Sequence, residues 1–524
     1  MKFNTLFSKA NETVNYMGGK AYILTPALEL YTTVVSTMLD NSYYEKADDR
    51  LVRIKNLVPL VDPVFVAKLA IYTREEMYLR TVPLVLVTEL AKVHKGDNLV
   101  SRTVERIVQR ADEITELLAY YELSNERKGV KKLNKLSKQI QKGLAGSFNK
   151  FDAYQLAKYN RDAHVKLKDA LFLIHPKAKS ETQQEIFNQL VADTLPVPYT
   201  WETELSKLGQ MPFGSEKEKQ EKKAAKWEEL VLSGKIGYMA LLRNLRNITT
   251  QGTDLAVQAA LQVITDRSRV KTSKQLPFRY LSAYAELETE LKSQVHAEKE
   301  KNRIQAALQA LEKAVIMASD NIPVADGITL ILSDNSGSMY GDAGGKSVVS
   351  AMSKRTTADI ANLFAVLYWM RAQNTIVGLF GDRLITPELQ RNKNVFENFA
   401  IVNTAAKKCG ASTEQGIFDM MEQLIDTKKM VDRIVIFSDC QVGSKCNWYD
   451  HKRRVGNDFN KLFQHYRKMN PHVVTYSVDL KGYGNTLFDK GVMTIGGWSE
   501  KLFDMMVALE EGESVVSSIE SIHL

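Results

Sequence analysis

Residues 328–340, ITLILSDNSGSMY, place the strongest constraint on the fold. The first six are apolar or favour β-structure, and they end abruptly at the carboxylate of Asp334. A turn with Ser336 and Ser338 follows, and apolar residues then recur with helical spacing over about 348–370. The pattern predicts a buried strand, a polar loop and a helix, as in α/β proteins with a parallel sheet.

The spacing of Asp334, Ser336 and Ser338, D-x-S-x-S, suits a divalent cation. Hard ions such as Mg²⁺ take oxygen ligands, at about 2.0–2.1 Å, and usually keep some waters. The same residue types also cap helices, because their side chains accept hydrogen bonds from the free N–H groups of the first turn. The motif alone therefore leaves a cation site and a helix cap open.

Two later residues favour the cation site. Asp439 directly follows a strand-like run, RIVIFS, and Thr413 lies in a polar loop before another helical stretch. In an open parallel sheet, the loops at the carboxyl ends of the strands gather along one crevice. We therefore expect Asp334, Thr413 and Asp439 to meet there.

Together these residues resemble the metal-ion-dependent adhesion site of von Willebrand factor A domains, in which D-x-S-x-S is followed by a threonine and then an aspartate. The resemblance covers about residues 326–524. It implies a Rossmann-like domain that holds Mg²⁺, or another divalent cation, through Asp334, Ser336, Ser338, Thr413 and Asp439, in part through water. In that family the open position of the ion commonly accepts a carboxylate from a partner, so the site docks proteins and does not catalyse.

The residues before about 322 are predicted to be nearly all helical. Thr25-Pro26 and Asp62-Pro63 each place a capping residue before a proline at the first helical position. Apolar segments of helical length recur between short polar breaks, which fits stacked helix pairs of the HEAT type; an ordinary helical bundle is the alternative. We predict two domains, 1–322 and 323–524.

Charge is divided unevenly between these domains. Residues 327–524 hold 22 basic and 22 acidic side chains, so the whole net charge of +8 belongs to the preceding part. A basic region beside a neutral one indicates an anionic partner, although a merely solvated surface also explains a surplus of this size.

Basic residues gather in two stretches. Residues 129–142, GVKKLNKLSKQIQK, are rich in lysine and contain no acid, and residues 158–179 combine cations with an aromatic ring, Tyr159. Such residues contact phosphates and stack on unpaired bases, although for any single lysine a solvated helix face is the simpler interpretation. The mixed charges of residues 214–226 predict a mobile loop or an exposed helix.

Three further stretches are distinctive: 73–89, 236–248 (IGYMALLRNLRNI) and 273–284. Arg243 and Arg246 are three residues apart and would share a helix face. These stretches resemble the TROVE module of Ro ribonucleoproteins, and the order of the domains agrees. The resemblance covers about residues 20–524, and the compact chain fits a bacterial or phage member.

The resemblance implies a monomeric ring of HEAT-like repeats closed by the A domain. It implies that the protein binds small noncoding Y-like RNA on a basic outer surface. It also implies that single-stranded 3′ ends of misfolded RNA bind in a central hole. The protein would act in RNA quality control, in the cytoplasm, beside an exoribonuclease. The residues expected to contact RNA are Lys158, Arg161, His164, Lys166, Lys168, His175, Arg74, Arg80, Arg243 and Arg246.

Among these, the four arginines either line the hole or hold helices together, and Arg279 is expected to serve packing.

Catalysis is not expected, because the sequence contains no H-E-x-x-H, G-x-S-x-G or P-loop motif. No run of about 18 apolar residues predicts a membrane span, and the first residues lack the apolar core of a signal peptide. The cysteines, Cys409, Cys440 and Cys446, show no metal-ligand spacing and are expected to be structural thiols in a reducing compartment. The alternative function is a magnesium-dependent protein-docking scaffold without RNA.

Overall fold

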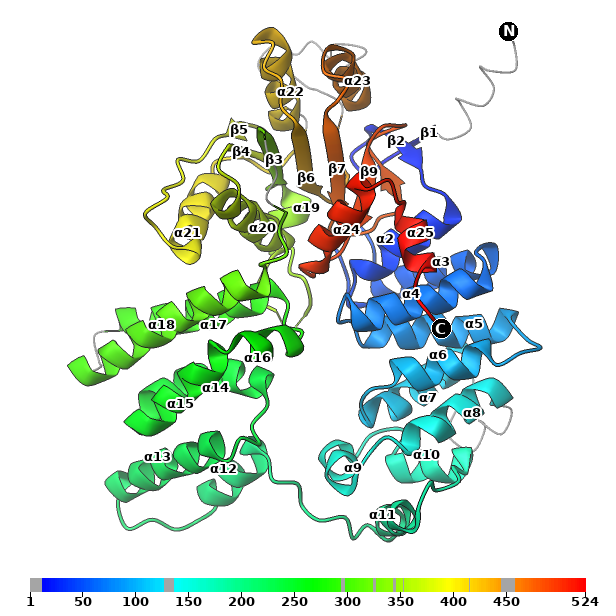
Figure 1. The fold of residues 1–524 in the computed structure, drawn as a ribbon, viewed down its shortest axis with the longest axis vertical. Coiled ribbons are helices and arrows are strands. Elements are labelled where there is room, and N and C mark those ends of the chain that lie inside the picture. Colours follow the sequence, from blue (N-terminus) through cyan, green and yellow to red (C-terminus); the bar gives the residue numbers. More distant parts are fainter. Residues whose placement is uncertain are drawn as a thin grey trace. The chain divides into compact units, whose positions relative to one another are not determined.

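The computed structural model describes residues 12–126, 136–293, 297–323, 327–342, 345–351, 353–413, 415–443 and 458–524. The chain forms two compact units (Figure 1). The sheet unit comprises Met1–Phe65 and Ser319–Ile522, and the helical unit comprises Val66–Ala318 and His523–Leu524. The compact units thus divide the chain differently from the predicted boundary at 322, because the first 65 residues fold with the C-terminal part.

A six-stranded sheet forms the centre of the sheet unit, in the order β5-β4-β3-β6-β7-β9. Neighbouring strands are parallel, except that β5 is antiparallel to β4. Since β3 lies between β4 and β6, the strand order reverses direction there, which leaves a crevice at the carboxyl ends of β3 and β6. The strands are β3 (Thr329–Asp334), β4 (Thr375–Phe380), β5 (Leu384–Ile385), β6 (Arg433–Ser438), β7 (Val474–Asp479) and β9 (Met493–Gly496).

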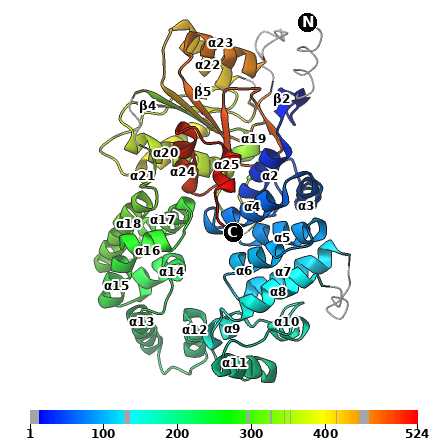
Figure 2. The same ribbon diagram turned by 45° about the vertical axis from the view of Figure 1, so that its right-hand side comes forward.

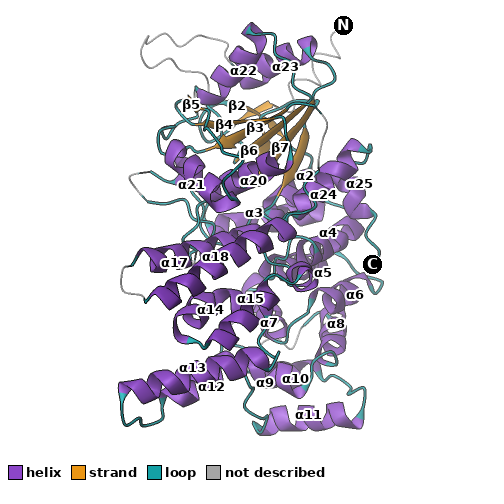
Figure 3. Cartoon of the chain, turned by 60° about the vertical axis from the view of Figure 1, so that its left-hand side comes forward, coloured by secondary structure: helices purple, strands orange, loops and turns teal. Residues whose placement is uncertain are grey.

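Helices cover both faces of this sheet (Figure 3). On one face, α22 and α23 contribute Phe418 and Phe463 to a continuous core with Leu332 and Ile436. On the other, Phe364 of α20 packs against Phe437 of β6 and Phe503 of α24. The helices are α19 (Gly337–Tyr340), α20 (Thr357–Arg371), α21 (Val395–Ala406), α22 (Gly416–Asp426), α23 (Phe459–Met469), α24 (Lys501–Glu510) and α25 (Val515–Glu520).

The strands predicted before Asp334 and Asp439 are confirmed, but the helix predicted from residue 348 begins later, at Thr357. Its start is fixed by a capping box: the Asp359 backbone N–H donates to Thr356 Oγ1 (3.1 Å), and the Asp359 carboxylate accepts from the Thr356 N–H (2.8 Å).

The N-terminal segment, residues 12–60, is not all helical as predicted. β1 (Glu12–Val14) and β2 (Lys20–Ile23) form a small antiparallel sheet with β8 (Asn485–Thr486), a pairing that no local pattern reveals. The predicted helix start at Thr25-Pro26 is confirmed, since Thr25 caps α2. The helices are α2 (Pro26–Val35), α3 (Ala47–Leu57) and the short 3₁₀ helix η1 (Val58–Leu60).

The helical unit consists of helices that pack on the next helix or the next but one in sequence, for example α14 on α15, α17 on α18, α5 on α7 and α6 on α8 (Figure 2). Asp62 caps the first of them by accepting from the Val64 and Phe65 N–H groups. None of the helices in the described part of the chain has both the length and the hydropathy needed to cross a bilayer.

The helices of this array are α4 (Pro63–Glu75), α5 (Thr81–Val93), α6 (Leu99–Ile107), α7 (Asp112–Ser124), α8 (Lys138–Phe148), α9 (Ala153–Tyr159), α10 (Leu167–Ile174), α11 (Glu181–Ala192), α12 (Trp201–Gly209), α13 (Glu216–Leu232), α14 (Tyr238–Gln251), α15 (Asp254–Ile264), α16 (Arg267–Thr272), α17 (Pro277–Lys292) and α18 (Glu298–Ala318).

Two charged stretches can be placed on this array. Most of residues 214–226 form the exposed first part of α13, as one of the two predicted possibilities. The lysine-rich stretch 129–142 falls partly outside the described residues, and α8 begins within it at Lys138.

Candidate metal centre and nucleic-acid interface

The five predicted metal ligands lie together at the carboxyl ends of β3 and β6. Asp334 is the last residue of β3, and Asp439 directly follows β6. Ser336 and Ser338 lie at the start of α19, and Thr413 lies in the loop before α22. All five are at most 3% exposed. The switch point of the sheet therefore gathers residues that are separated by up to 105 positions in the sequence.

Hydrogen bonds fix the first three of these side chains. Asp334 accepts from the Ser336 N–H (2.9 Å) and from Ser438 Oγ (2.6 Å). The hydroxyls of Ser336 and Ser338 lie 3.2 Å apart, and Ser338 is hydrogen-bonded to Asp439. Ser336 makes no capping hydrogen bond to α19, so a helix cap does not explain its side chain.

The remaining ligands are held by the loop that follows β6. Thr413 Oγ1 donates to the Gln441 carbonyl (2.9 Å) and accepts from the Gly443 N–H (3.2 Å). Asp439 Oδ1 accepts from the Gln441 N–H (3.0 Å), while its Oδ2 has no hydrogen-bond partner among the described residues. An unpartnered carboxylate oxygen is thus buried beside two hydroxyl groups.

The electrostatics of this cluster fit a cation. Burial raises the pKa of both Asp334 and Asp439, and repulsion from Asp439 raises that of Asp334 further. A divalent ion would relieve this repulsion and give the free oxygen of Asp439 a partner. The described residues contain no cluster of three His, Cys, Asp or Glu side chains suited to a metal, so hydroxyls would have to complete this ligand set.

A third buried carboxylate, Asp479, ends β7 and was not predicted. Its Oδ1 accepts from the Lys481 and Gly482 N–H groups (2.9 and 2.7 Å), and its Oδ2 has no partner among the described residues. Burial raises the pKa of Asp479 to about 7 and lowers that of the neighbouring Lys481 to about 8. A strand ending in aspartate is the signal that identified Asp334 and Asp439, and it applied here as well.

The predicted arginines of the helical unit differ in their surroundings. Arg74 is buried: its guanidinium donates to a carboxylate oxygen of Glu113 (2.7 Å) and to the Ile107 carbonyl (3.0 Å). It holds α4 to the end of α6 and the first turn of α7. Arg246 is exposed and lies 3.5 Å from Glu286 of α17.

Arg80, Arg243 and Arg279 form an arginine cluster. They come from the residue before α5, from α14 and from α17. The pKa of Arg279 is lowered by burial and then by repulsion from Arg80 and Arg243, so both of these charges lie close enough to Arg279 to repel it. None of the three forms an ion pair within the part of the chain that the structure describes. Nearby, Lys274 Nζ donates to the Glu75 carbonyl (3.2 Å), so the segments before α5 and α17 meet.

The cations predicted between 158 and 175 spread over the end of α9, the α9–α10 connection and α10, rather than along one helix. Lys158 lies beside the rings of Tyr154 and Tyr159, with its Nζ at 5.8 and 5.7 Å from their centroids. Arg161 is exposed in the connection, and His175, also exposed, ends α10 in the left-handed conformation.

Three of these side chains already have acidic neighbours. His164 Nε2 lies 3.0 Å from Glu122, Lys166 pairs with Asp162 (2.7 Å), and Lys168 pairs with Asp193 (3.0 Å). Glu122 is buried, but the two lysine pairs are solvent-accessible, and ion pairs of that kind contribute little to stability and can exchange for phosphates.

A family model described as the TROVE domain matches residues 27–195 and 193–327, more than half of the chain. The chain belongs to the TROVE-domain family. Proteins of this family bind RNA and occur as components of ribonucleoproteins.

Telomerase protein component 1 of Mus musculus is 23% identical over 352 residues, which is 51% of this TROVE chain and 13% of the relative. The protein of the same name from Rattus norvegicus is 23% identical over 311 residues, 44% of the chain and 11% of the relative. The chain therefore spans only about an eighth of the length of these relatives.

The crystal structure of the Ro (RSR) protein of Deinococcus radiodurans is similar in fold, with a TM-score of 0.57 and 16% identity, over 93% of this chain and all of the other. This likeness confirms the predicted fold class, a helical-repeat part followed by an α/β domain.

Within this TROVE protein, the matched residues hold the arginine cluster and the cations from Lys158 to His175, whereas the five predicted metal ligands lie outside the match.

Proposed function

We propose that this TROVE protein is a non-catalytic RNA scaffold that acts in RNA quality control in the cytoplasm. The arginine cluster takes the single-stranded 3′ end of a misfolded RNA, and the surface from Lys158 to His175 takes a small structured RNA of the Y type. An exoribonuclease that trims the captured RNA is a fitting partner.

The observation that carries this proposal is the arginine cluster itself. Three like charges held near one another without acidic partners repel, and an anion removes that repulsion. Guanidinium groups bind phosphate oxygens bidentately and also stack on bases, so they suit a single strand.

The second surface is supported by exposed cations beside aromatic rings. Lys158 between Tyr154 and Tyr159 can contact a phosphate while a ring stacks on an unpaired base.

Sequencing of the RNA that co-purifies at moderate salt tests this function. We expect one or two abundant small structured RNAs with the natural chain. The Lys158→Ala/Lys166→Ala/Lys168→Ala variant should lose most of them, because it removes three exposed cations without a buried contact. Equal enrichment of RNA with both proteins would show that the surface from Lys158 to His175 does not bind it. Absence of RNA from both would favour the docking scaffold, which binds proteins through the cation without RNA.

The proposal includes Mg²⁺, or another divalent cation, at Asp334, Ser336, Ser338, Thr413 and Asp439. The unpartnered Oδ2 of Asp439 and the mutual repulsion of the two carboxylates support it. The bound ion would supply a fixed positive charge that neutralises these carboxylates. Two carboxylates on one site do not suit the paired-metal chemistry of nucleases, which accords with a non-catalytic role.

Asp334→Asn should abolish binding of Mn²⁺, used as a probe for Mg²⁺, in equilibrium dialysis, because half of the carboxylate charge at the site is lost. Affinity for RNA should stay within about twofold, since the predicted RNA contacts belong to the other unit and keep their side chains in this variant. Thr427→Ala, a substitution at an exposed position at the end of α22, is the control for effects of mutagenesis and purification. Loss of RNA binding in a folded Asp334→Asn protein would show that the two sites are coupled.

A further inference from the structure

The predicted metal ligands are covered by the chain's own N-terminal segment. In docking A domains the ion accepts a carboxylate from another protein, which requires an open site. Here the five ligands are almost inaccessible to solvent, although they lie at the open crevice of a parallel sheet. Two pieces of the N-terminal segment account for this: the loop at residues 42–45 and the turn at residues 15–19.

The loop at 42–45 touches the D-x-S-x-S motif directly. The Tyr43 hydroxyl is hydrogen-bonded to the carboxylate of Asp342, just beyond the motif. The Tyr44 hydroxyl donates to Met17 Sδ (3.0 Å) and lies within hydrogen-bonding reach of Ser338, one of the predicted ligands. A Cβ atom on Gly337 would lie 3.4 Å from the Tyr43 hydroxyl, so little space is left between loop and motif.

The turn at 15–19 holds the other side of the site. The Tyr16 N–H donates to Gln441 Oε1 (2.9 Å), and Asn15 Nδ2 donates to the Val442 carbonyl (2.8 Å). These residues follow Asp439 and belong to the loop that positions Thr413. A Cβ atom at Gly19 would lie 2.1 Å from the Val442 carbonyl oxygen, so the turn approaches as closely as a glycine allows.

Aromatic packing joins the two pieces into a tyrosine cap, defined as Tyr16, Tyr43, Tyr44 and Tyr483. The rings of Tyr16 and Tyr44 are stacked, with centroids 5.0 Å apart and planes within 1°. Tyr483 meets both edge-on at 5.5 Å, and Tyr43 lies 4.9 Å from Tyr44.

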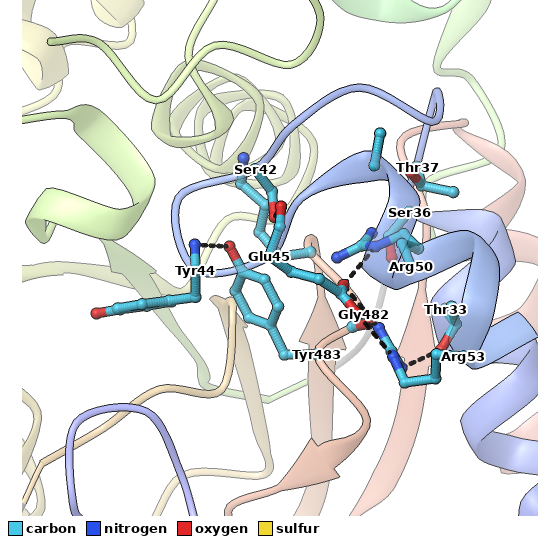
Figure 4. Close-up of polar contacts among 12 residues, drawn as sticks. Thr33, Ser36, Thr37, Ser42, Tyr44, Glu45, Arg50, Arg53, Gly482 and Tyr483 are labelled. Carbon is cyan, nitrogen blue, oxygen red and sulfur yellow. Dashed lines mark hydrogen bonds and ion pairs between the residues drawn. The ribbon is translucent and has the colours of Figure 1, made fainter.

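The cap is anchored beneath by polar contacts. Figure 4 shows the Tyr44 N–H donating to the Tyr483 hydroxyl (3.3 Å) and, beside it, the Glu45 carboxylate held by Arg50 (2.6 Å) and Arg53 (2.9 Å). Arg53 also donates to the Gly482 carbonyl (2.6 Å), next to Tyr483. The loop is thus fixed both to the site and to the segment after β7.

We propose that the partner of this metal site is the chain's own N-terminal segment: the tyrosine cap occupies the position that a docking A domain offers to an external carboxylate. This inference rests on the divalent cation proposed above. The cation then binds only the capped form, and by linkage it holds residues 12–60 against the sheet. The ion thus joins the N-terminal segment to the loops that follow β3 and β6.

The test compares two measurements on the full chain. Equilibrium dialysis with Mn²⁺ gives the affinity, and limited chymotrypsin digestion gives the rate of cutting after Leu39, Tyr43 or Tyr44. With Mg²⁺ at about ten times its Kd, cutting in this loop should slow about tenfold, because binding to the capped form alone reduces opening by that factor. Acetate, the external carboxylate, should not strengthen Mn²⁺ binding. In Asp439→Asn, Mg²⁺ should not change the cutting rate.

Matched tyrosine variants locate the effect. Tyr43→Phe/Tyr44→Phe keeps the rings and removes the hydroxyls at Asp342 and Ser338, so protection by Mg²⁺ should fall. Tyr22→Phe lies on the same segment and loses a bond from Asn460 Nδ2 (2.8 Å) away from the site. It should keep the full protection by Mg²⁺.

Three outcomes would overturn the inference. If Mn²⁺ binds but the rate of cutting is unchanged, or if acetate tightens Mn²⁺ binding, the cation site would stand but the tyrosine cap would not be its partner. Failure of Mn²⁺ to bind would remove the cation itself, and the cap's role with it.

Discussion

Replacing Arg80, Arg243 and Arg279 with glutamine should weaken the binding of a single-stranded RNA oligonucleotide by at least about a hundredfold, since one hydrogen bond to a charged group contributes about 1.5 kcal/mol or more. The logarithm of the binding constant should also depend less steeply on the logarithm of salt concentration, by about 2, because each phosphate contact to a single strand contributes about 0.7 to that slope. Fluorescence anisotropy at several KCl concentrations measures both quantities.

A matched variant separates the arginine cluster from net charge. Lys217, Lys219 and Lys222 are exposed on α13, and their replacement with glutamine removes the same charge from the helical unit. This control should change affinity only a few-fold. Equal losses in the two variants would mean that overall charge, and not the cluster, holds the RNA.

Arg74→Met should destabilise the helical unit by about 3–5 kcal/mol, because it leaves the Glu113 carboxylate buried without its cation. A cost of this size is a large part of a domain's stability, so thermal unfolding monitored by circular dichroism should detect it readily.

The double variant Arg74→Met/Glu113→Gln should recover much of this loss. A glutamine oxygen can still accept from the Gln109 and Arg110 N–H groups, which Glu113 binds at 2.8 and 3.1 Å. Recovery of stability together with unchanged RNA affinity would assign Arg74 to packing. If the double variant folds but binds RNA weakly, Arg74 contributes to RNA binding.

The gathering of the five predicted metal ligands at one end of the sheet was predictable because its signals are local. A strand of buried residues that stops at a carboxylate can be read from a few positions, as with Asp334 and Asp439, and the parallel sheet then brings the strand ends together. Asp479 carries the same signal without accompanying hydroxyls, so the D-x-S-x-S pattern with its later threonine and aspartate does not include it.

The features that were missed depend on contacts between distant parts of the chain. β1 and β2 are short, and their identity as strands follows from pairing with β8 near the other end. Arg74 and Arg80 are six residues apart, yet one is buried against Glu113 and the other is exposed in the arginine cluster. Only the packing of α4, α14 and α17 decides which arginine is structural. Of the predicted thiols, Cys409 and Cys440 are buried and free, and Cys446 lies outside the described residues.

The pairing of β2 with β8 also affects how the chain is made. Tyr22 and Ile23 emerge from the ribosome some 460 residues before their partners Asn485 and Thr486. At about 5–20 residues per second, the first strands wait for tens of seconds with an unpaired edge, while the helical array between them can fold. Such an edge can pair with other chains. Nascent chains stalled within the helical part should therefore need a chaperone at β1 and β2, whereas emergence of β8 lets these strands find their place.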